Sequence, residues 1–227
     1  MKDGFTTLFQ RKKMVLIMSL PENNPEWCRA AFENGADAVK GHINVHHRAS
    51  GTHFGRWSEE RAKLEAMLEP DLGPVGLVLG GSLENASLDA EEVRACPFAF
   101  CSVYAHHLPA WALDIHPLMA ACDNGYTPEE IRAMPGMGVD VLEASVIPGD
   151  EYGQGLSLRD LMRYRSIADT VSLPVVVPTQ RAIQPREVPA LIRAGVRGLM
   201  IGAVVTGRGT ESIARAVATF REAIDGV

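Results

Sequence analysis

Short apolar runs recur along the whole chain, and more polar segments with a helical spacing of apolar residues separate most of them. Eight of these runs are expected to form strands, at residues 14–20, 36–44, 74–79, 98–104, 118–122, 139–146, 173–177 and 198–201. Strands that alternate with helices pair in parallel, and eight such units are typical of a closed (β/α)₈ barrel. The pattern therefore predicts an α/β fold consisting of one TIM barrel.

The segments that follow these runs carry the helical pattern or a shorter trace of it. Helices are expected at residues 25–34, 58–68, 89–96, 109–115, from 128 onward, 158–168, 185–194 and 211–224. Thr127 is the clearest helix start, because a proline and a glutamate occupy the first and third positions after it. Ser58 and Asp89 are expected to cap their helices. The segment 109–115 is the weakest, because it is brief and His116-Pro117 interrupts it.

Length and charge narrow the possible partners. A chain of 227 residues suits one domain over residues 1–227, and its net charge of −6 comes without a basic stripe. Nucleic acid and anionic membranes are therefore not expected as partners. The run at 14–20 is too short for a signal peptide or a membrane span, and the four cysteines form no C-x-x-C pair. We expect a cytoplasmic protein with reduced thiols. A homo-oligomer remains open.

Polar residues occupy the ends of several expected strands, which is where this fold places its chemistry. Strand alternation puts Lys40 and His42 on the face opposite Val39 and Ile43, so Lys40 is expected to point into the barrel. Glu143 lies at the matching height of a strand of the same parity. We expect Lys40 and Glu143 to form a catalytic acid/base pair, with His42 or His106 polarising a carbonyl oxygen. Substrate-binding positions are expected at Asn44, Arg48, His106, Asp123, Ser145 and Gln180.

Other roles for Lys40 stay open at this point. It could extend out of the rim, pair with a buried acid, hold a substrate carboxylate or phosphate, or add to a carbonyl as an imine-forming amine. A lysine close to a carboxylate should stay charged, which favours proton transfer over imine formation. All seven histidines precede residue 117, but no H-x-H or H-E-x-x-H spacing appears. We expect no cofactor and no metal site, with a divalent ion as the alternative.

Two loops are candidates for closing over a ligand. The segment 45–57 is long for an α/β connection, and Gly51 and Gly55 would let it hinge as a lid that carries Arg48 or His53. The glycine-bearing segment 148–155 is its counterpart. At the end of the chain, residues 202–207 are small and begin a helix, so their backbone N–H groups predict a phosphate site.

The C-terminal third, LPVVVPTQRAIQPREVPALIRAGVRGLMIGAVVTG, resembles the ribulose-phosphate-binding group of barrels, and most closely the N-acylglucosamine-6-phosphate 2-epimerases. ADAVK at 36–40 is also similar to that family's second strand, where an arginine usually stands at the position of Lys40. The resemblance implies a phosphate site made by Arg181, Gly202, Ala203, Thr206 and Gly207. The family's catalytic lysine and glutamate do not carry over, because LVLGG at 77–81 and Pro178-Thr179 stand in their places.

These observations predict an isomerase or epimerase that acts on a small phosphorylated sugar or sugar acid by proton transfer next to a carbonyl. Two alternatives remain. One is a carbon–carbon lyase in which Lys40 forms an imine, and the other is a barrel that binds a phosphorylated metabolite or flavin phosphate without turning it over.

Overall fold

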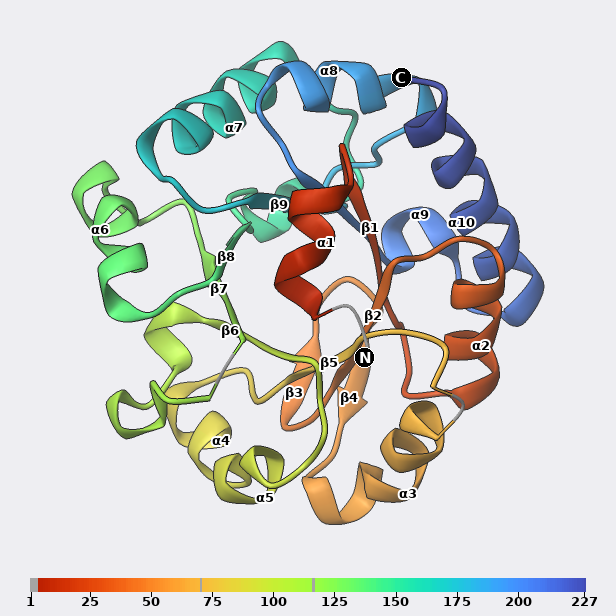
Figure 1. Cartoon of the computed structure of the whole chain (residues 1–227), viewed down its shortest axis with the longest axis vertical. Helices are drawn as coiled ribbons and strands as arrows, with labels where there is room; N and C mark the ends of the chain where they lie inside the picture. Colours follow the sequence, from red (N-terminus) through yellow and green to blue (C-terminus); the bar gives the residue numbers. More distant parts are fainter. Residues whose placement is uncertain (1–3, 70, 116) are drawn as a thin grey trace.

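A computed structural model describes residues 4–69, 71–115 and 117–227 of the chain. Eight parallel strands close into a barrel in the order β1-β10-β9-β8-β7-β6-β5-β2, as the apolar pattern predicted (Figure 1). The barrel strands are β1 (Val15–Ser19), β2 (Ala38–His42), β5 (Val75–Val78), β6 (Phe100–Tyr104), β7 (Leu118–Cys122), β8 (Val141–Ala144), β9 (Val175–Pro178) and β10 (Gly198–Ile201). Each lies within or overlaps one of the eight expected runs.

Helices surround the barrel in a ring, and short 3₁₀ turns complete several of the connections (Figure 1). The α-helices are α1 (Phe5–Arg11), α2 (Pro25–Glu33), α3 (Trp57–Leu68), α4 (Leu83–Ser87), α5 (Ala90–Arg94), α6 (Pro128–Ala133), α7 (Leu158–Thr170), α8 (Val188–Arg193), α9 (Ala203–Thr206) and α10 (Thr210–Asp225). The 3₁₀ turns are η1 (Ala105–His107), η2 (Ala110–Ala112), η3 (Met134–Met137), η4 (Gly149–Glu151) and η5 (Pro185–Glu187).

The helix starts follow the sequence signals only in part. Thr127 caps α6 as predicted, because its side chain accepts a hydrogen bond from the Glu130 N–H. The prediction for Ser58 was wrong, since α3 already begins at the preceding residue. Asp89 precedes α5 but makes no side-chain cap there, because its carboxylate binds other partners. The segment 109–115 forms only the turn η2, and His116 lies outside the described residues.

A helix that the pattern analysis did not identify, α1, closes the N-terminal end of the barrel and crosses its centre in Figure 1. The Phe5 ring stacks on the Phe100 ring with centroids 3.8 Å apart. Gly76 makes room for this stack, because a Cβ at that position would lie 2.3 Å from the Phe100 ring. Leu8 and Phe9 add to the same buried cluster. The barrel floor is therefore apolar and sealed.

The expected lid loop is a short antiparallel hairpin, made of β3 (Val45–His47) and β4 (Thr52–Phe54). Two hydrogen bonds tie it to loops at the C-terminal end of the barrel. Thr52 Oγ1 donates to the Pro21 carbonyl at 2.7 Å, and Arg208 Nη1 donates to the Ser50 carbonyl at 3.0 Å. The segment predicted as a lid is thus a hydrogen-bonded β-hairpin at the mouth of the barrel.

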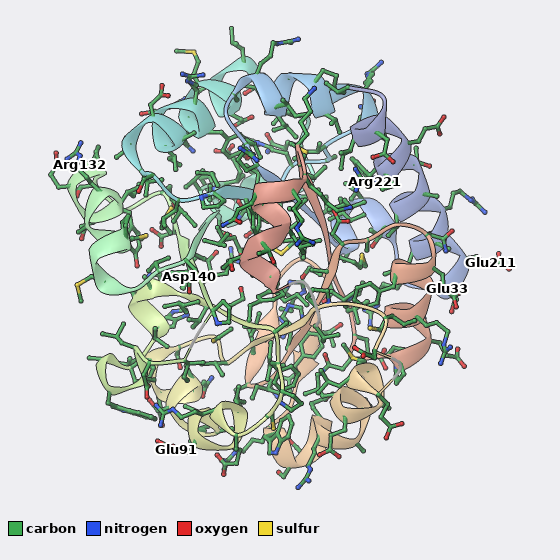
Figure 2. All side chains as sticks on the ribbon, in the orientation of Figure 1. Glu33, Glu91, Arg132, Asp140, Glu211 and Arg221 are labelled. Carbon is green, nitrogen blue, oxygen red and sulfur yellow. The ribbon has the colours of Figure 1, made fainter. Side chains whose placement is uncertain are left out.

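Charged side chains populate the outside of the helix ring. Figure 2 shows Glu33, Glu91, Arg132 and Glu211 at its outer edge. Within the described part of the chain, no helix is both long and apolar enough to cross a bilayer.

Removing the floor contact should destabilise the barrel. Phe5→Ala is expected to lower the free energy of unfolding by about 3 to 5 kcal/mol, because it leaves a cavity beside Phe100. Denaturant unfolding followed by circular dichroism measures this loss. Leu83→Ala, at an exposed position, is the matched control and should change the value little. A Phe5→Ala variant as stable as this control would show that α1 does not hold the floor.

Candidate active site

A cavity of about 590 Å³ opens at the C-terminal end of the barrel, where this fold holds its active sites. Its lower part is lined by residues on the barrel strands or directly after them. They are Ser19, Lys40, His42, Val78, Ser102, Val103, Tyr104, Ala121, Glu143, Pro178, Met200 and Gly202. The walls come from the β3–β4 hairpin and from the loops after β5, β6, β7, β8 and β9.

Lys40 and Glu143 meet inside the barrel among these residues. Lys40 Nζ lies 3.2 Å from Glu143 Oε2, and the two residues are only 5% and 6% exposed. Their strands β2 and β8 are four places apart in either direction around the closed barrel, so the pair spans a full diameter. The alternation and parity arguments thus placed both side chains correctly. Whether they are catalytic stays a prediction.

Hydroxyl groups complete the surroundings of the pair. Ser102 Oγ lies 3.4 Å from Lys40 Nζ and donates to Glu143 Oε2 at 3.2 Å. Ser145 Oγ donates to the other carboxylate oxygen, Oε1, at 2.7 Å. Both oxygens of Glu143 therefore accept hydrogen bonds, as a buried carboxylate requires. Ser145 was predicted to bind substrate. It supports Glu143 in this structure and also lines the cavity, so its role in substrate binding stays a prediction.

His42 and His47 form an aromatic wall beside the pair. The His42 ring packs against the His47 and Phe54 rings, with centroids 4.6 Å and 4.7 Å away. Burial lowers the pKa of His42 well below its usual value, and the nearby His47 and Lys40 lower it further. Burial, together with Lys40, lowers the pKa of His47 to about 4. Both rings are therefore neutral near pH 7.

One ring nitrogen of His42 has no protein partner among the described residues. Its Nε2 lies 3.4 Å from Ser19 Oγ, whereas its buried Nδ1 has no hydrogen-bond partner among the described residues. A buried polar atom without a partner is uncommon, and it is often explained by a ligand or water. A neutral imidazole can polarise a carbonyl oxygen by donating from this nitrogen. The catalytic role of His42 stays a prediction.

Two tyrosines that the sequence analysis did not select also line the cavity. Burial raises the pKa of Tyr104 and of Tyr152, so both are neutral hydroxyl donors. Gln180 Nε2 donates to the Tyr152 hydroxyl at 2.6 Å, and Gln180 Oε1 accepts from the Ile147 N–H at 3.1 Å. Gln180 therefore orients Tyr152. Tyr104 ends β6 two residues before the candidate His106, and that position is the signal that could have identified it.

The remaining predicted substrate-binding residues divide into two groups. Arg48, His106 and Asp123 line the cavity, and His106 Nδ1 lies 3.0 Å from the Tyr126 hydroxyl. Asn44 is not part of the lining, because its side-chain amide donates to the Leu79 carbonyl and to the Asp89 carboxylate. Asn44 thus secures the end of β2. Its role as a substrate ligand has no support in this arrangement.

Arg181 has structural partners in this structure. Its guanidinium lies 3.0 Å from Asp160 Oδ1 and 2.5 Å from Glu151 Oε2, and it also donates to the Glu151 carbonyl. It does not line the cavity. These contacts tie the turn after β9 to α7 and to the loop after β8. The predicted role of Arg181 in binding phosphate stays a prediction, and its two ion pairs also give it a structural role.

The small-residue segment after β10 contributes less to the cavity than expected. Gly202 lines it, but the Gly202 N–H donates to Thr179 Oγ1 at 3.0 Å. Ala203, Thr206 and Gly207 belong to or follow the short helix α9 and do not line the cavity. Their part in a phosphate site stays a prediction. Among the described residues, no group of three or more His, Cys, Asp or Glu side chains is arranged to hold a metal ion.

Comparison with known proteins supports the fold. No protein-family model and no curated protein sequence matches the chain. Solved structures do match it over nearly its whole length. Tryptophan synthase from M. tuberculosis has a TM-score of 0.70 at 13% identity, and the match covers 98% of each chain.

Two further matches have names that concern phosphorylated compounds. (S)-3-O-geranylgeranylglyceryl phosphate synthase from Thermoplasma acidophilum, in complex with sn-glycerol-1-phosphate, has a TM-score of 0.61 at 16% identity over 100% of both chains. A protein from Coccidioides immitis described as a fructose-1,6-biphosphate aldolase has a TM-score of 0.63 at 14% identity, covering 97% of this chain and 92% of that one. These similar structures are (β/α)₈ barrel enzymes. At these identities the likeness establishes the barrel fold.

The buried histidines predict a loss of stability in mild acid. Below the unfolded pKa near 6.5 the unfolded chain binds protons that folded His42 and His47 do not, so stability is full above pH 6.5 and falls toward pH 4. The slope is at most about 1.4 kcal/mol per pH unit for each histidine. Urea unfolding between pH 7 and pH 5 should show a weaker pH dependence in His47→Gln. His53→Gln, at an exposed hairpin position, should keep the wild-type slope, and equal slopes in all three proteins would contradict the assignment.

Arg181→Ala should destabilise the protein by about 3 to 5 kcal/mol, because Asp160 would stay buried without its cation. Urea unfolding measures the change. Arg165→Ala breaks an exposed pair with Asp169 and should cost less than about 1 kcal/mol. A loss in Arg181→Ala no larger than in this control would refute the structural role. Unchanged phosphate affinity in the folded variant would also remove Arg181 from the phosphate site.

Proposed function

We propose that this protein is an enzyme of the aldolase and lyase type that forms an imine between Lys40 and a small anionic ketone. The observation that carries the proposal is the contact of Lys40 Nζ with Glu143 Oε2, 3.2 Å long and at the bottom of an open cavity. From the sequence, such a contact was expected to favour proton transfer over an imine, but a similar barrel described as an aldolase supports the imine as the first candidate. An imine-forming lysine needs a group that removes its proton and later returns it. Glu143 is in direct contact with the amine and can do both.

The chemistry uses these two side chains in turn. Glu143 takes a proton from the Lys40 ammonium, and the free amine adds to the ketone carbon to form a carbinolamine. Glu143 then protonates the carbinolamine hydroxyl, which leaves as water and gives a protonated imine. When Glu143 removes the proton of the β-hydroxyl, the carbon–carbon bond breaks and its electron pair moves into the imine. An aldehyde leaves, and an enamine stays on Lys40.

The cycle closes by reversing the first steps. Glu143 returns its proton to the enamine carbon, and water adds to the resulting imine to release the second product and the free Lys40. His42 lines the cavity beside this pair, and its neutral ring is proposed to polarise the carbonyl oxygen during the addition. No cofactor enters this scheme.

The substrate is proposed to be small and to carry a phosphate or carboxylate. The cavity volume suits a compact molecule, and the hydroxyls of Ser19, Tyr104 and Tyr152 line it as donors for substrate oxygens. The names of two similar barrels concern phosphorylated compounds, and the C-terminal sequence resembles barrels that bind sugar phosphates. These observations support the substrate class without naming a compound.

The isomerase or epimerase predicted from the sequence is the second candidate. One observation favours it. Ser102 and Ser145 hold both oxygens of Glu143, which arranges Lys40 and Glu143 as an acid and a base without requiring an imine. The two functions differ in whether a covalent adduct forms on Lys40.

Borohydride reduction separates the two functions. In the presence of dihydroxyacetone phosphate or pyruvate, reduction should add the mass of the reduced imine to a peptide that contains Lys40. Lys40→Met should form no adduct, whereas Lys63→Met removes an exposed lysine and should react like the wild type. Exchange of substrate carbon-bound hydrogen with solvent deuterium, without an adduct, would instead support the isomerase. If Lys40→Met and Glu143→Gln keep full turnover of an identified substrate, both proposals fail.

A further inference from the structure

Arg48 crosses the mouth of the barrel. It follows β3 in the hairpin after β2, and its guanidinium lies against Gly149 in the loop after β8. Because β2 and β8 are opposite each other in the closed barrel, Arg48 spans the same diameter as Lys40 and Glu143 do deeper down. Both Arg48 and Gly149 line the cavity. The Arg48 guanidinium therefore places a positive charge at the mouth of the cavity that contains the Lys40 amine.

Gly149 leaves the space that the Arg48 side chain occupies. A Cβ at Gly149 would lie 1.5 Å from Arg48 Nη1 and 2.5 Å from its Cζ, so any side chain there would displace the guanidinium. Gly155, in the same loop, has no heavy atom within 4 Å of its corresponding position. The fit to Arg48 is thus a property of Gly149 in particular.

Among the described residues, Arg48 is a cation that lines the cavity without a carboxylate partner. Lys40 is paired with Glu143, and Arg181 is paired with Asp160 and Glu151. In the described part of the chain, by contrast, no carboxylate forms an ion pair with Arg48. The nearby His47 is neutral, so it does not compete for an anion as a second cation. A guanidinium that faces a cavity without a partner can hold an oxyanion through two parallel hydrogen bonds.

We infer that Arg48 binds the terminal oxyanion of the substrate, a phosphate monoester or a carboxylate, while the substrate carbonyl reaches down to Lys40. This inference rests on the proposed function for the carbonyl end and goes beyond it for the anionic end. It places the anion on the hairpin side of the mouth, away from Arg181. It also makes Gly149 a positioning residue, because the position of Arg48 depends on the absence of a side chain there.

Anion affinity tests the inference without requiring turnover. Titration calorimetry should detect binding of inorganic phosphate or of pyruvate to the wild-type protein, and the stronger of the two identifies the oxyanion. Arg48→Ala should weaken that binding at least tenfold, since a charge-assisted hydrogen bond contributes about 1.5 to 3 kcal/mol. Arg48→Lys should recover only part of the loss, because an ammonium cannot form the paired contact. Arg48 is exposed, so these variants should stay folded.

The glycine pair supplies the matched control. Gly149→Ala should weaken anion binding in parallel with Arg48→Ala, whereas Gly155→Ala should bind like the wild type. No measurable binding of either anion, or binding that Arg48→Ala leaves unchanged, overturns the inference. Wild-type anion affinity in Gly149→Ala would show that Gly149 does not position Arg48 for anion binding.

A second measurement keeps this inference separate from the proposed function. Borohydride trapping with dihydroxyacetone, which has no anion, should give similar adduct yields in the wild type and in Arg48→Ala, while trapping of the preferred anionic ketone should decrease in the variant. Trapping that fails with every ketone refutes imine chemistry and leaves the anion site standing. Normal trapping with unchanged anion affinity in Arg48→Ala refutes the anion site alone.

Discussion

The ion pair between Lys40 and Glu143 is the constraint on which the rest of the barrel interior depends. Two charges so deeply buried cost several kcal/mol each to desolvate, and their attraction offsets that cost only with good geometry and further hydrogen bonds. Ser102 and Ser145 supply those bonds. The apolar floor formed by α1 is the other requirement, because it excludes water from below. The apolar cluster closes the N-terminal end of the barrel, and the cavity with its polar lining opens at the C-terminal end.

The same diameter carries a second cation nearer to solvent. Lys40 has its counter-ion in Glu143, whereas Arg48 lies against Gly149 and forms no ion pair with any residue that the structure describes. A ligand with a carbonyl at one end and an oxyanion at the other could contact Lys40 with the carbonyl and Arg48 with the oxyanion. Separate sites for the anion and the carbonyl suit catalysis, because the anionic end supplies binding energy away from the reacting carbon and orients that carbon toward the Lys40 amine.

Sequence periodicity predicted the barrel and its central pair because both follow from short-range rules. Alternation along residues 36–44 fixes which face Lys40 occupies, and strand parity fixes that Glu143 can share its layer. The helix α1 was missed because its apolar residues precede the first strand, where the repeating unit gives no reason to expect one. The hairpin was missed because its pairing joins two polar segments. Asp89 resembled a helix cap, but its carboxylate instead binds Asn44 and the Trp57 N–H, partners that are distant in the sequence.

Arg181 shows why a resemblance in sequence does not by itself place a side chain. The segment around it resembles phosphate-binding barrels, yet two carboxylates outside that segment, Glu151 and Asp160, determine where its guanidinium lies. Both belong to the connection between β8 and β9, which the resemblance does not cover. Arg181 thereby fixes the loop after β8, the same loop that carries Gly149 and Tyr152. The resemblance implies that Arg181 contacts a phosphate directly. Its ion pairs suggest an indirect effect instead, because Arg181 holds the loop after β8, and Arg48 lies against Gly149 in that loop.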